Sequence, residues 1–473
     1  MASKTDAILA MPSQAGLKSA APATFLAPDE LSVCENISFG LNAERKKRLG
    51  TTRYNTSTIS GTANIVALGD FWRFGTSLTP TQKFVAAANG QLYQSPGDGT
   101  WTSILNPFGS NTSLITNITV AQGYAVFSDG SSVPQKYDQT AVTALDGGAG
   151  TAPRFTAASY HLARLFVVGT AAHPSGFDVS AGGDITLWTG GDVLLNASLD
   201  PDDGDACIGI SRTFHKRLYI FKGPNFGSIH EISGNTLSTL QHDRVFNGLP
   251  LLNNKAIITT PNDIFWLSRS GAHSLVTTQQ YGDTTAAFLS EPVQDIWQTQ
   301  LNPSALDAAV GFWNPLYGYV GWFVTPAGST TNEWALVYHY LISDPSPRGK
   351  KFWSVWKMGG DVAGYSAQVM VTPSAFSGAG QPRLYLGGSA DGFVYAGDQT
   401  TLTDGNGDAY TARVKTGINL TLGQASVLHE KQFYALTTYF EPVGAYNHDV
   451  NITVDNRTQS FQVVMSGQGD VLA

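Results

Sequence analysis

The sequence has few charged residues and almost no cysteine. Of its 473 residues, 14% are Asp, Glu, Lys or Arg, against about 25% in average proteins. The formal net charge of -8 argues against a protein that grips nucleic acid or an anionic membrane through a basic surface. Cys34 and Cys207 lie far apart and in no metal-ligand spacing, so we expect two free thiols instead of a disulfide framework.

Long apolar runs are also lacking. No stretch approaches the ~18 residues that span a bilayer, and residues 1–30 lack the apolar core of ~7–15 residues that marks a signal peptide. We therefore expect no membrane span and synthesis in a cytoplasm. Residues 1–30 are rich in Ala, Ser and Pro, with isolated apolar residues at Met11, Leu17, Phe25 and Leu26. This composition predicts an extended arm that becomes ordered against a neighbouring protein.

Glycine and aromatic residues are abundant instead. The chain has 50 glycines and 11% aromatic residues, and Ser and Thr are frequent throughout. This composition is typical of an all-β protein. Because single cores rarely grow beyond ~250–300 residues, we expect either one large repetitive domain or two to three domains.

A short hairpin pattern recurs along the chain. It is a β-type run, a Gly-centred break and, in most copies, a second β-type run, as in LYLGGSADGFVYAGD from Leu384. The copies start at Phe84, Tyr124, Leu162, Lys216, Asn262, Tyr317 and Pro382. Hairpins recurring at roughly 40–50 residues are typical of β-propeller blades. The sequence therefore predicts a propeller of six to eight blades over residues 31–400.

The pattern changes after residue 400. The stretch from Thr401 reads as a hairpin with an Asp/Gly/Asn turn, and residues 433–444 and 448–464 alternate with period 2 like half-buried antiparallel strands. We predict a smaller C-terminal β domain over residues 401–473.

Carboxylates near turns are the first candidates for chemistry. Asp391 and Gly392 lie at a hairpin break, where Gly supplies a positive φ and Asp bonds its own backbone, so we interpret them as a turn instead of a catalytic site. Ser95 to Trp101, SPGDGTW, approaches the Asp-box turn of sialidase propellers, which is structural. Asp200 to Asp205, DPDDGD, is dense enough in carboxylates to consider calcium, but the ligand ladder of an EF-hand is absent.

Two further patterns are weaker. Asp404 opens DGNGDAY, which mimics an EF-hand loop, but Lys415 stands where the loop requires Glu. Ser354 and Lys357 have the SxxK spacing of β-lactamases, within aromatic residues that favour a buried strand. The histidines form no zinc-ligand spacing. We therefore assign no catalytic, cofactor-binding or metal residues.

One stretch carries a family resemblance. In ENISFGLNAERKKRLGTTRYN, Glu35 to Asn55, an Asn soon after the start precedes a basic cluster and then Arg48, Leu49 and Gly50, close to an Arg-Pro-Gly element. This order resembles the opening of the β-propeller virion proteins of tailed bacteriophages: the tail nozzle, hub or stabilisation proteins that close the portal channel in short-tailed phages. Residues 161–188, 217–234 and 383–408 are similar to blades of that family, although Leu49 stands where the family usually has Pro.

The resemblance implies a structural, non-enzymatic virion protein, made in the host cytoplasm. It implies a homo-hexameric ring below the portal or adaptor, in contact with other tail proteins, that continues the DNA channel and helps to retain and eject the genome. DNA would pass without specific binding, which fits a low-charge, acidic chain, since a bore lined with Lys and Arg would hold the phosphates.

The basic cluster itself is open to two interpretations. Arg45, Lys46, Lys47 and Arg48 either meet an acidic neighbour at an interface or form a solvated surface run. A second functional class also remains, a carbohydrate-binding or carbohydrate-cleaving propeller (lectin or glycosidase). A convergent carboxylate pair or an arginine cluster at the channel mouth would favour that class.

Overall fold

A computed structural model gives the fold. It describes residues 15–22, 25–27, 29–74, 80–105, 117–146, 150–275, 288–345, 349–360, 362–371, 382–397, 400–416, 446–454 and 457–465. The chain divides into two compact units, one of residues 8–420 and one of residues 1–7 with 421–473.

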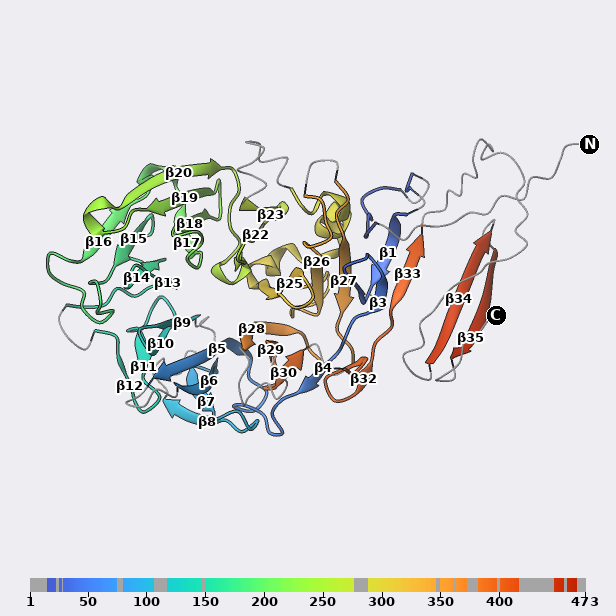
Figure 1. The fold of residues 1–473 in the computed structure, drawn as a ribbon, viewed down its shortest axis with the longest axis horizontal. Coiled ribbons are helices and arrows are strands. Elements are labelled where there is room, and N and C mark those ends of the chain that lie inside the picture. The colour runs from blue at the N-terminus through green and yellow to red at the C-terminus, as the bar shows by residue number, and fades with distance from the viewer. Residues whose placement is uncertain are drawn as a thin grey trace, which may run out of the picture. The chain divides into compact units, whose positions relative to one another are not determined.

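Seven sheets of the larger unit form a β-propeller (Figure 1). The first two blades are β5 (Ile65–Phe74), β6 (Pro80–Ala88), β7 (Gln91–Ser95) and β8 (Thr102–Leu105), then β9 (Asn117–Ala121), β10 (Tyr124–Ser128), β11 (Gln135–Tyr137) and β12 (Val142–Ala144). The third and fourth are β13 (Ala157–His161), β14 (Arg164–Val168), β15 (Gly176–Val179) and β16 (Leu194–Ser198), then β17 (Ala206–Ile210), β18 (Leu218–Gly223), β19 (Ser228–Ser233) and β20 (Gln241–Asn247).

The remaining blades are less uniform. The fifth has β21 (Ile258–Thr259), β22 (Ile264–Ser268) and β23 (Gly271–Ser274). The sixth has β24 (Val310–Asn314), β25 (Tyr319–Val324), β26 (Trp334–Tyr338) and β27 (Trp353–Lys357), extended by β1 (Leu31–Glu35) and β33 (Arg413–Thr416). The seventh has β28 (Tyr365–Val371), β29 (Arg383–Gly388), β30 (Val394–Gly397) and, from the N-terminal side, β4 (Thr51–Arg53).

Short elements lie in the connections between the blade strands and at both ends of the propeller. They are the hairpin strands β2 (Ile37–Phe39), β3 (Arg45–Lys47), β31 (Thr403–Asp404) and β32 (Asp408–Ala409), and the short helices η1 (Pro201–Asp203), η2 (Leu237–Thr239), η3 (Asn254–Ala256), η4 (Glu291–Val293), η5 (Ile296–Gln300) and η6 (Pro303–Ala308).

The seven sheets confirm the predicted propeller of six to eight blades. Each predicted hairpin copy contains or directly precedes the second strand of its blade.

The innermost strands close a ring. Each blade contacts the next through its first strand, with η3 between β17 and β24, and β28 of the seventh blade packs on β5 of the first. The outermost strand of the seventh blade is β4, which pairs with β30 although more than 340 residues separate them: Arg53 faces Tyr395 and Thr51 faces Gly397. Strand β4, which precedes the first blade in the sequence, therefore completes the last blade of the propeller (Figure 1).

The core is divided among the junctions between blades. Seven clusters of buried apolar side chains each lie between two neighbouring blades. Side chains alternate between the two faces of a strand, so Phe166 packs toward the fourth blade and Leu165 toward the second. Because both faces of the middle strands of most blades are buried, few positions there are left for charged residues, which agrees with the low charge content.

The N-terminal segment packs on the same chain. Leu17 N–H donates to Trp353 O at 3.0 Å, and Lys18 N–H to Leu31 O at 2.8 Å. Leu17 and Leu26 are buried, whereas Phe25 is 80% exposed. The prediction that Leu17 and Leu26 become ordered against a neighbouring protein is therefore wrong, because both are buried within this chain, Leu17 against the sixth blade. Residues 1–14, including Met11, lie outside the described residues.

The smaller unit holds an antiparallel hairpin of β34 (Tyr446–Val454) and β35 (Arg457–Met465). This agrees with the period-2 pattern of the sequence, while residues 417–445 lie outside the described part. The described residues 401–416 lie in the larger unit.

The arm gives a direct test of its packing. Replacing Leu17 by Ala should lower the free energy of unfolding by about 2–5 kcal/mol, as buried leucines do when a cavity replaces them. Phe25→Ala is the matched control and should change it by less than about 0.5 kcal/mol, since Phe25 is exposed. Urea unfolding of the two variants checks this. Equal effects would show that Leu17 is not part of the core.

Candidate functional site

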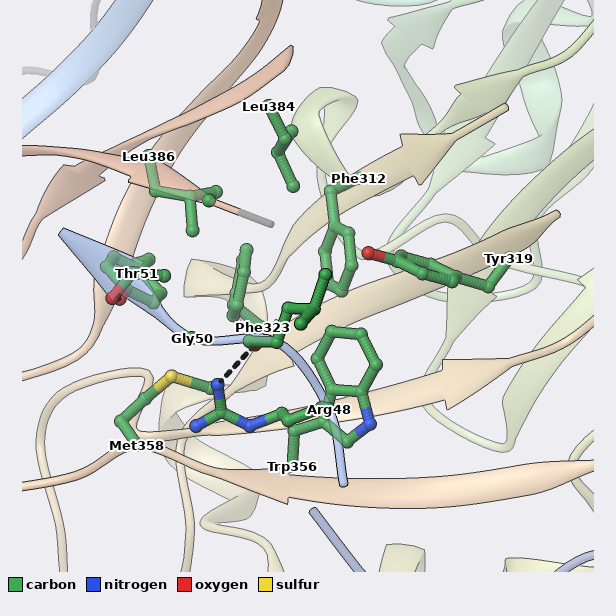
Figure 2. A pocket seen from close by; sticks show the side chains of 13 residues that line it. Arg48, Gly50, Thr51, Phe312, Tyr319, Phe323, Trp356, Met358, Leu384 and Leu386 are labelled. Carbon is green, nitrogen blue, oxygen red and sulfur yellow. Dashed lines mark hydrogen bonds between the residues drawn. The ribbon is translucent and has the colours of Figure 1, made fainter. Parts of the chain in front are cut away.

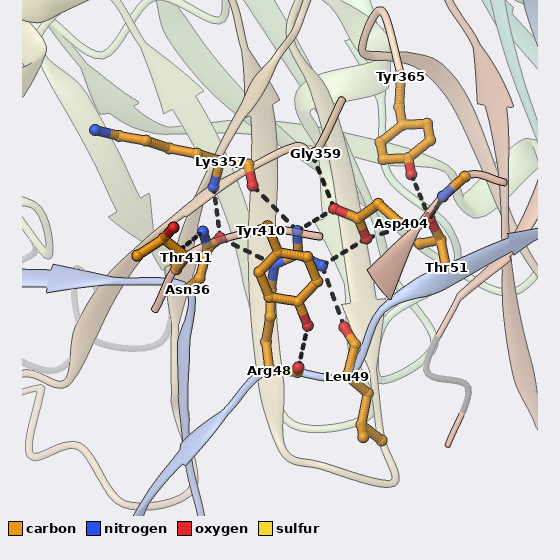
Figure 3. Close-up of polar contacts among 11 residues, drawn as sticks. Asn36, Arg48, Leu49, Thr51, Lys357, Gly359, Tyr365, Asp404, Tyr410 and Thr411 are labelled. Atoms are coloured by element: carbon orange, nitrogen blue, oxygen red, sulfur yellow. Dashed lines mark hydrogen bonds and ion pairs between the residues drawn. The ribbon is translucent and has the colours of Figure 1, made fainter. Parts of the chain in front are cut away.

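The stretch that carries the family resemblance folds where the propeller closes. Asn36 links β1 to β2, and Arg48 lies between β3 and β4. Asp404, at the end of β31, comes from the segment that follows the seventh blade. Figure 3 shows these three side chains converging in one buried cluster, which we call the closure cluster.

Arg48 is the centre of the closure cluster. Its side chain is 3% exposed and that of its partner Asp404 is fully buried. A guanidinium has five N–H donors, and all five are used here. Nε donates to Asn36 Oδ1 at 3.0 Å, Nη1 to Asp404 Oδ1 at 2.9 Å and Leu49 O at 3.2 Å, and Nη2 to Lys357 O at 3.1 Å and to Asp404 Oδ2.

Further contacts from neighbouring residues surround the ion pair between Arg48 and Asp404. Asp404 also accepts the N–H of Gly359 at 3.0 Å, and the guanidinium lies 3.8 Å from the ring centre of Tyr410, whose hydroxyl donates to Arg48 O. Burial lowers the pKa of Arg48, but the Asp404 carboxylate outweighs burial, so the net shift is upward. The guanidinium therefore stays charged and fixed.

Asn36 joins three segments around this pair. Its Oδ1 accepts both Arg48 Nε–H and Lys357 N–H, the latter at 2.8 Å, and its Nδ2 donates to Thr411 O at 2.7 Å. Its φ of 55° lies in the left-handed region, which Asn tolerates better than most residues. Asn36 and Arg48 thus act as structural links between both ends of the propeller.

The predictions for the basic cluster are corrected in part. Arg48 is buried, so a surface run is wrong for this residue, and the acidic residue it meets belongs to the same chain. Lys46 is exposed, Arg45 is half-buried and Lys47 lies 4.3 Å from the ring centre of Tyr410.

A small cavity lies beside the closure cluster, between the sixth and seventh blades (Figure 2). Its volume is about 20 Å³, and its walls are mainly apolar and aromatic, among them Phe312, Phe323 and Leu386. Gly50 lines it where a Cβ would collide with Thr403 O. This volume holds about one water molecule, which is too little for a substrate or cofactor.

The acidic cluster Asp200–Asp205 is occupied by a lysine of the same chain. The side chain of Lys222 is fully buried. Its ammonium donates to Leu199 O at 2.7 Å, Asp200 O at 2.9 Å and Asp203 Oδ1 at 2.6 Å. An ammonium has three donors, so the position where calcium was considered already holds a satisfied cation. Within the described residues, no group of three or more His, Cys, Asp and Glu could hold a metal ion.

The turn interpretation of Asp391 is confirmed. Its carboxylate accepts the Phe393 N–H at 2.9 Å and the Tyr395 hydroxyl at 2.8 Å, between β29 and β30. Gly392 has φ 70° and no room for a Cβ. Burial raises the pKa of Asp391, but both of its carboxylate oxygens accept hydrogen bonds from residues of the hairpin.

The Asp-box-like stretch is also a turn, between β7 and β8. Ser95 is buried, and Asp98 accepts the Thr100 N–H at 2.9 Å. The ring of Trp101 lies 5.0 Å from that of Phe84. The Ser and Asp therefore brace the hairpin, while the Trp packs beside it.

The remaining candidates occupy structural positions. Ser354 and Lys357 are in β27, as predicted, and their separation of three places them on opposite faces of the strand, so they cannot act on one substrate. Cys34 and Cys207 are free and buried, and burial raises the pKa of each thiol to about 12. The expectation of free thiols is confirmed.

Three buried histidines were not singled out by the sequence. Burial lowers the pKa of His273 and His339 to about 3 and that of His230 to about 4. Their Nε2 atoms have hydroxyl partners, Ser268 for His273 at 2.8 Å and Ser228 for His230 at 3.0 Å. Their Nδ1 atoms have no partner among the described residues. All three are therefore neutral core residues at pH 7.

The side chain of Lys255 links two blades that are not neighbours in the ring. Lys255 in η3, at the start of the fifth blade, donates from Nζ to Val66 O in β5 of the first blade. Other blades separate these two on both sides of the ring, so the side chain reaches across the central channel. Burial lowers the pKa of Lys255 to about 8. Sequence reasoning missed this contact, since nothing local marks a pair 189 residues apart.

Comparisons with known proteins find no family for this chain. No protein-family model matches the sequence, and no curated protein matches it. The computationally designed Ika8 protein is 12% identical with a TM-score of 0.37, over 72% of this chain and 98% of its own. Virginiamycin B lyase from Staphylococcus aureus is 7% identical with a TM-score of 0.42, over 72% and 97%. These similarities carry no argument about what this chain does.

Among the described residues, no helix is long and apolar enough to cross a membrane.

The closure cluster predicts a large stability effect. Arg48→Met should lower the free energy of unfolding by about 3–5 kcal/mol, because it leaves the Asp404 carboxylate buried without its cation. The control is Arg269→Met, which removes an ion pair with Asp307 whose side chains are 48% and 57% exposed and should cost less than about 1 kcal/mol. Adding Asp404→Leu to Arg48→Met should recover part of the loss. If Arg48→Met is as mild as Arg269→Met in urea unfolding, the cluster does not hold the closure.

The buried histidines predict a loss of stability in acid. Their pKa values are below the ordinary value of 6.5, so the unfolded chain binds more protons than the folded one at lower pH. Their contribution is complete above about pH 6.5 and is lost progressively as the pH falls toward 3–4. Urea unfolding at about pH 7.5 and about pH 5 should show this fall. His339→Gln should flatten the pH dependence, and His215→Gln, at an exposed histidine, is the matched control; equal slopes for the two variants would contradict the assignment.

Proposed function

We propose that this chain is a structural protein of a tailed-phage virion. In this proposal six copies form a ring below the portal or adaptor, in the tail nozzle or hub, and the ring continues the DNA channel that retains and ejects the genome. The protein carries out no reaction, and DNA passes it without sequence-specific contacts.

One observation carries the proposal. The stretch that resembles the virion family, Glu35 to Asn55, supplies Asn36 and Arg48 to the closure cluster and strand β4 to the seventh blade. The shared residues therefore have an architectural role, as expected for a family defined by its assembly and not by an active site. Their polar groups are engaged with one another, and the adjacent cavity has room for about one water molecule.

The acidic and basic candidates fit a structural role in the same way. Lys222 neutralises the acidic cluster, and Asp391 and Asp98 hold turns. A carboxylate that already accepts backbone N–H groups is a poor general acid or base, because its lone pairs are committed to the fold.

The propeller axis is not the duct in this proposal. Lys255 crosses it from the fifth blade to the first, and duplex DNA is far wider than a gap bridged by one lysine side chain. The DNA channel would instead lie on the axis of the ring, between copies. An acidic, charge-poor surface suits such a channel, because few cations are available to hold phosphates.

Particle symmetry tests the proposal. Negative-stain electron microscopy of the purified full chain should show rings with six-fold symmetry and an open axial bore. A screen of the same preparation against immobilised glycans and glycoside substrates serves as the control for the other class. Isolated single propellers that bind or cleave a glycan would replace the proposal with a lectin or glycosidase.

A further inference from the structure

The ammonium of Lys255, at the axis of the propeller, has no counter-ion among the described residues. It donates to Val66 O of the first blade, and a carbonyl oxygen carries only a partial charge. The side chain is half-buried. Loss of water around it lowers the pKa of Lys255 to about 8, and no acidic side chain of the described chain offsets this. The group is therefore still a cation at pH 7. An ammonium has three donors, of which this hydrogen bond uses one.

Two buried cations elsewhere in the propeller are neutralised by the chain itself. Arg48 pairs with Asp404, and Lys222 pairs with Asp203. Taking a cation out of water without a counter-ion is costly. Lys255 thus differs from these two residues, because the fold encloses its charge without providing an opposite one. An anion from solution would remove this cost.

Arg212 places a second cation beside the axis. It follows β17, the first strand of the fourth blade, and its N–H donates at 3.3 Å to Thr259 Oγ1 in β21, the first strand of the fifth blade. Its side chain is exposed, yet the surrounding protein lowers its pKa. A guanidinium on the outer surface would keep its full shell of water, so the combination indicates a solvent-filled recess enclosed by protein.

The two cations belong to one region of the axis. The N–H of Ile210, the last residue of β17, donates to Asn254 Oδ1 at 3.0 Å, which brings the end of β17 beside η3. Arg212 is two residues beyond Ile210, and Lys255 directly follows Asn254. As for Lys255, no acidic group within the described part of the chain contributes to the pKa of Arg212. Charges of one sign in an enclosed recess focus the electrostatic field and attract the opposite sign.

We propose that the recess at the propeller axis, beside the fourth and fifth blades, binds an oxyanion through Lys255 and Arg212. The oxyanion is a carboxylate or a phosphate group. A guanidinium presents a planar fork of donors that matches two oxygens of such a group, whereas an ammonium acts as a point charge. A halide ion has no paired oxygens for the fork, so it should bind less well. The inference concerns a single copy of the chain and does not rest on the proposed ring.

Thermal unfolding of the full chain at pH 7 tests the site. Inorganic phosphate and acetate are titrated separately, with sodium chloride keeping the ionic strength constant. The midpoint of unfolding should rise and reach a plateau with at least one of them, because a ligand that binds only the folded chain stabilises it. A plateau with phosphate alone assigns a phosphate group, and a plateau with acetate alone assigns a carboxylate.

Three variants separate the charge of the site from its architecture. Lys255→Gln removes the charge but keeps a donor for Val66 O. It should weaken oxyanion binding by about 10-fold or more, and Arg212→Gln, at an exposed side chain, should do the same. Lys216→Gln, at an exposed lysine between β17 and β18, is the matched control and should respond like the wild-type chain. Circular dichroism checks that each variant is folded.

Several results would overturn the inference. They are a wild-type response no larger than the response to chloride, a wild-type response in a folded Lys255→Gln or Arg212→Gln, and loss of the response in Lys216→Gln, which would indicate a general charge effect. If Lys255→Gln does not fold, Arg212→Gln decides alone. Six-fold rings from a chain without an oxyanion response would leave the proposed ring standing and reject this site.

Discussion

The buried ion pair between Arg48 and Asp404 is the interaction on which the closed propeller depends. It joins residues 356 positions apart, one before the first blade and one after the last. A buried guanidinium is costly unless each donor is satisfied, and here the five acceptors come from Asn36, Leu49, Lys357 and both oxygens of Asp404. The pair can form only when both ends of the ring are in place, so it couples closure of the propeller to its stability.

The need to satisfy each buried donor also explains how other polar groups are buried. Both faces of the middle strands of most blades are covered, so a charge inside the fold needs a partner from the chain itself. Lys222 neutralises Asp203 and fills two backbone acceptors, and Lys255 satisfies a carbonyl on a strand across the axis. Serine hydroxyls form hydrogen bonds with Nε2 of His230 and His273. Side chains that look like catalytic or metal-binding candidates in the sequence, such as Asp203 and Asp391, therefore use their polar atoms in hydrogen bonds within the fold.

Local patterns predicted local structure well. The Gly-centred hairpins, the turn at Asp391 and the buried strand at Ser354 all follow from short-range preferences, because strand alternation and positive φ are properties of a few adjacent residues. Prediction failed where a residue's environment comes from distant segments. Arg48 looked like part of an exposed basic run, and Leu17 looked like an anchor for another protein, yet both are buried by residues about 340 or more positions away.

The sequence by itself determined an all-β chain of repeated hairpins, low in charge because its sheets have two apolar faces. Tertiary structure alone decided that there are seven blades, that β4 completes the last one, and that Asp404, the start of an apparent calcium loop, is the counter-ion of Arg48. The physical reason is that side-chain periodicity is encoded over a few residues. The partner of a buried charge, in contrast, is chosen by ring closure, which brings together segments that no local pattern connects.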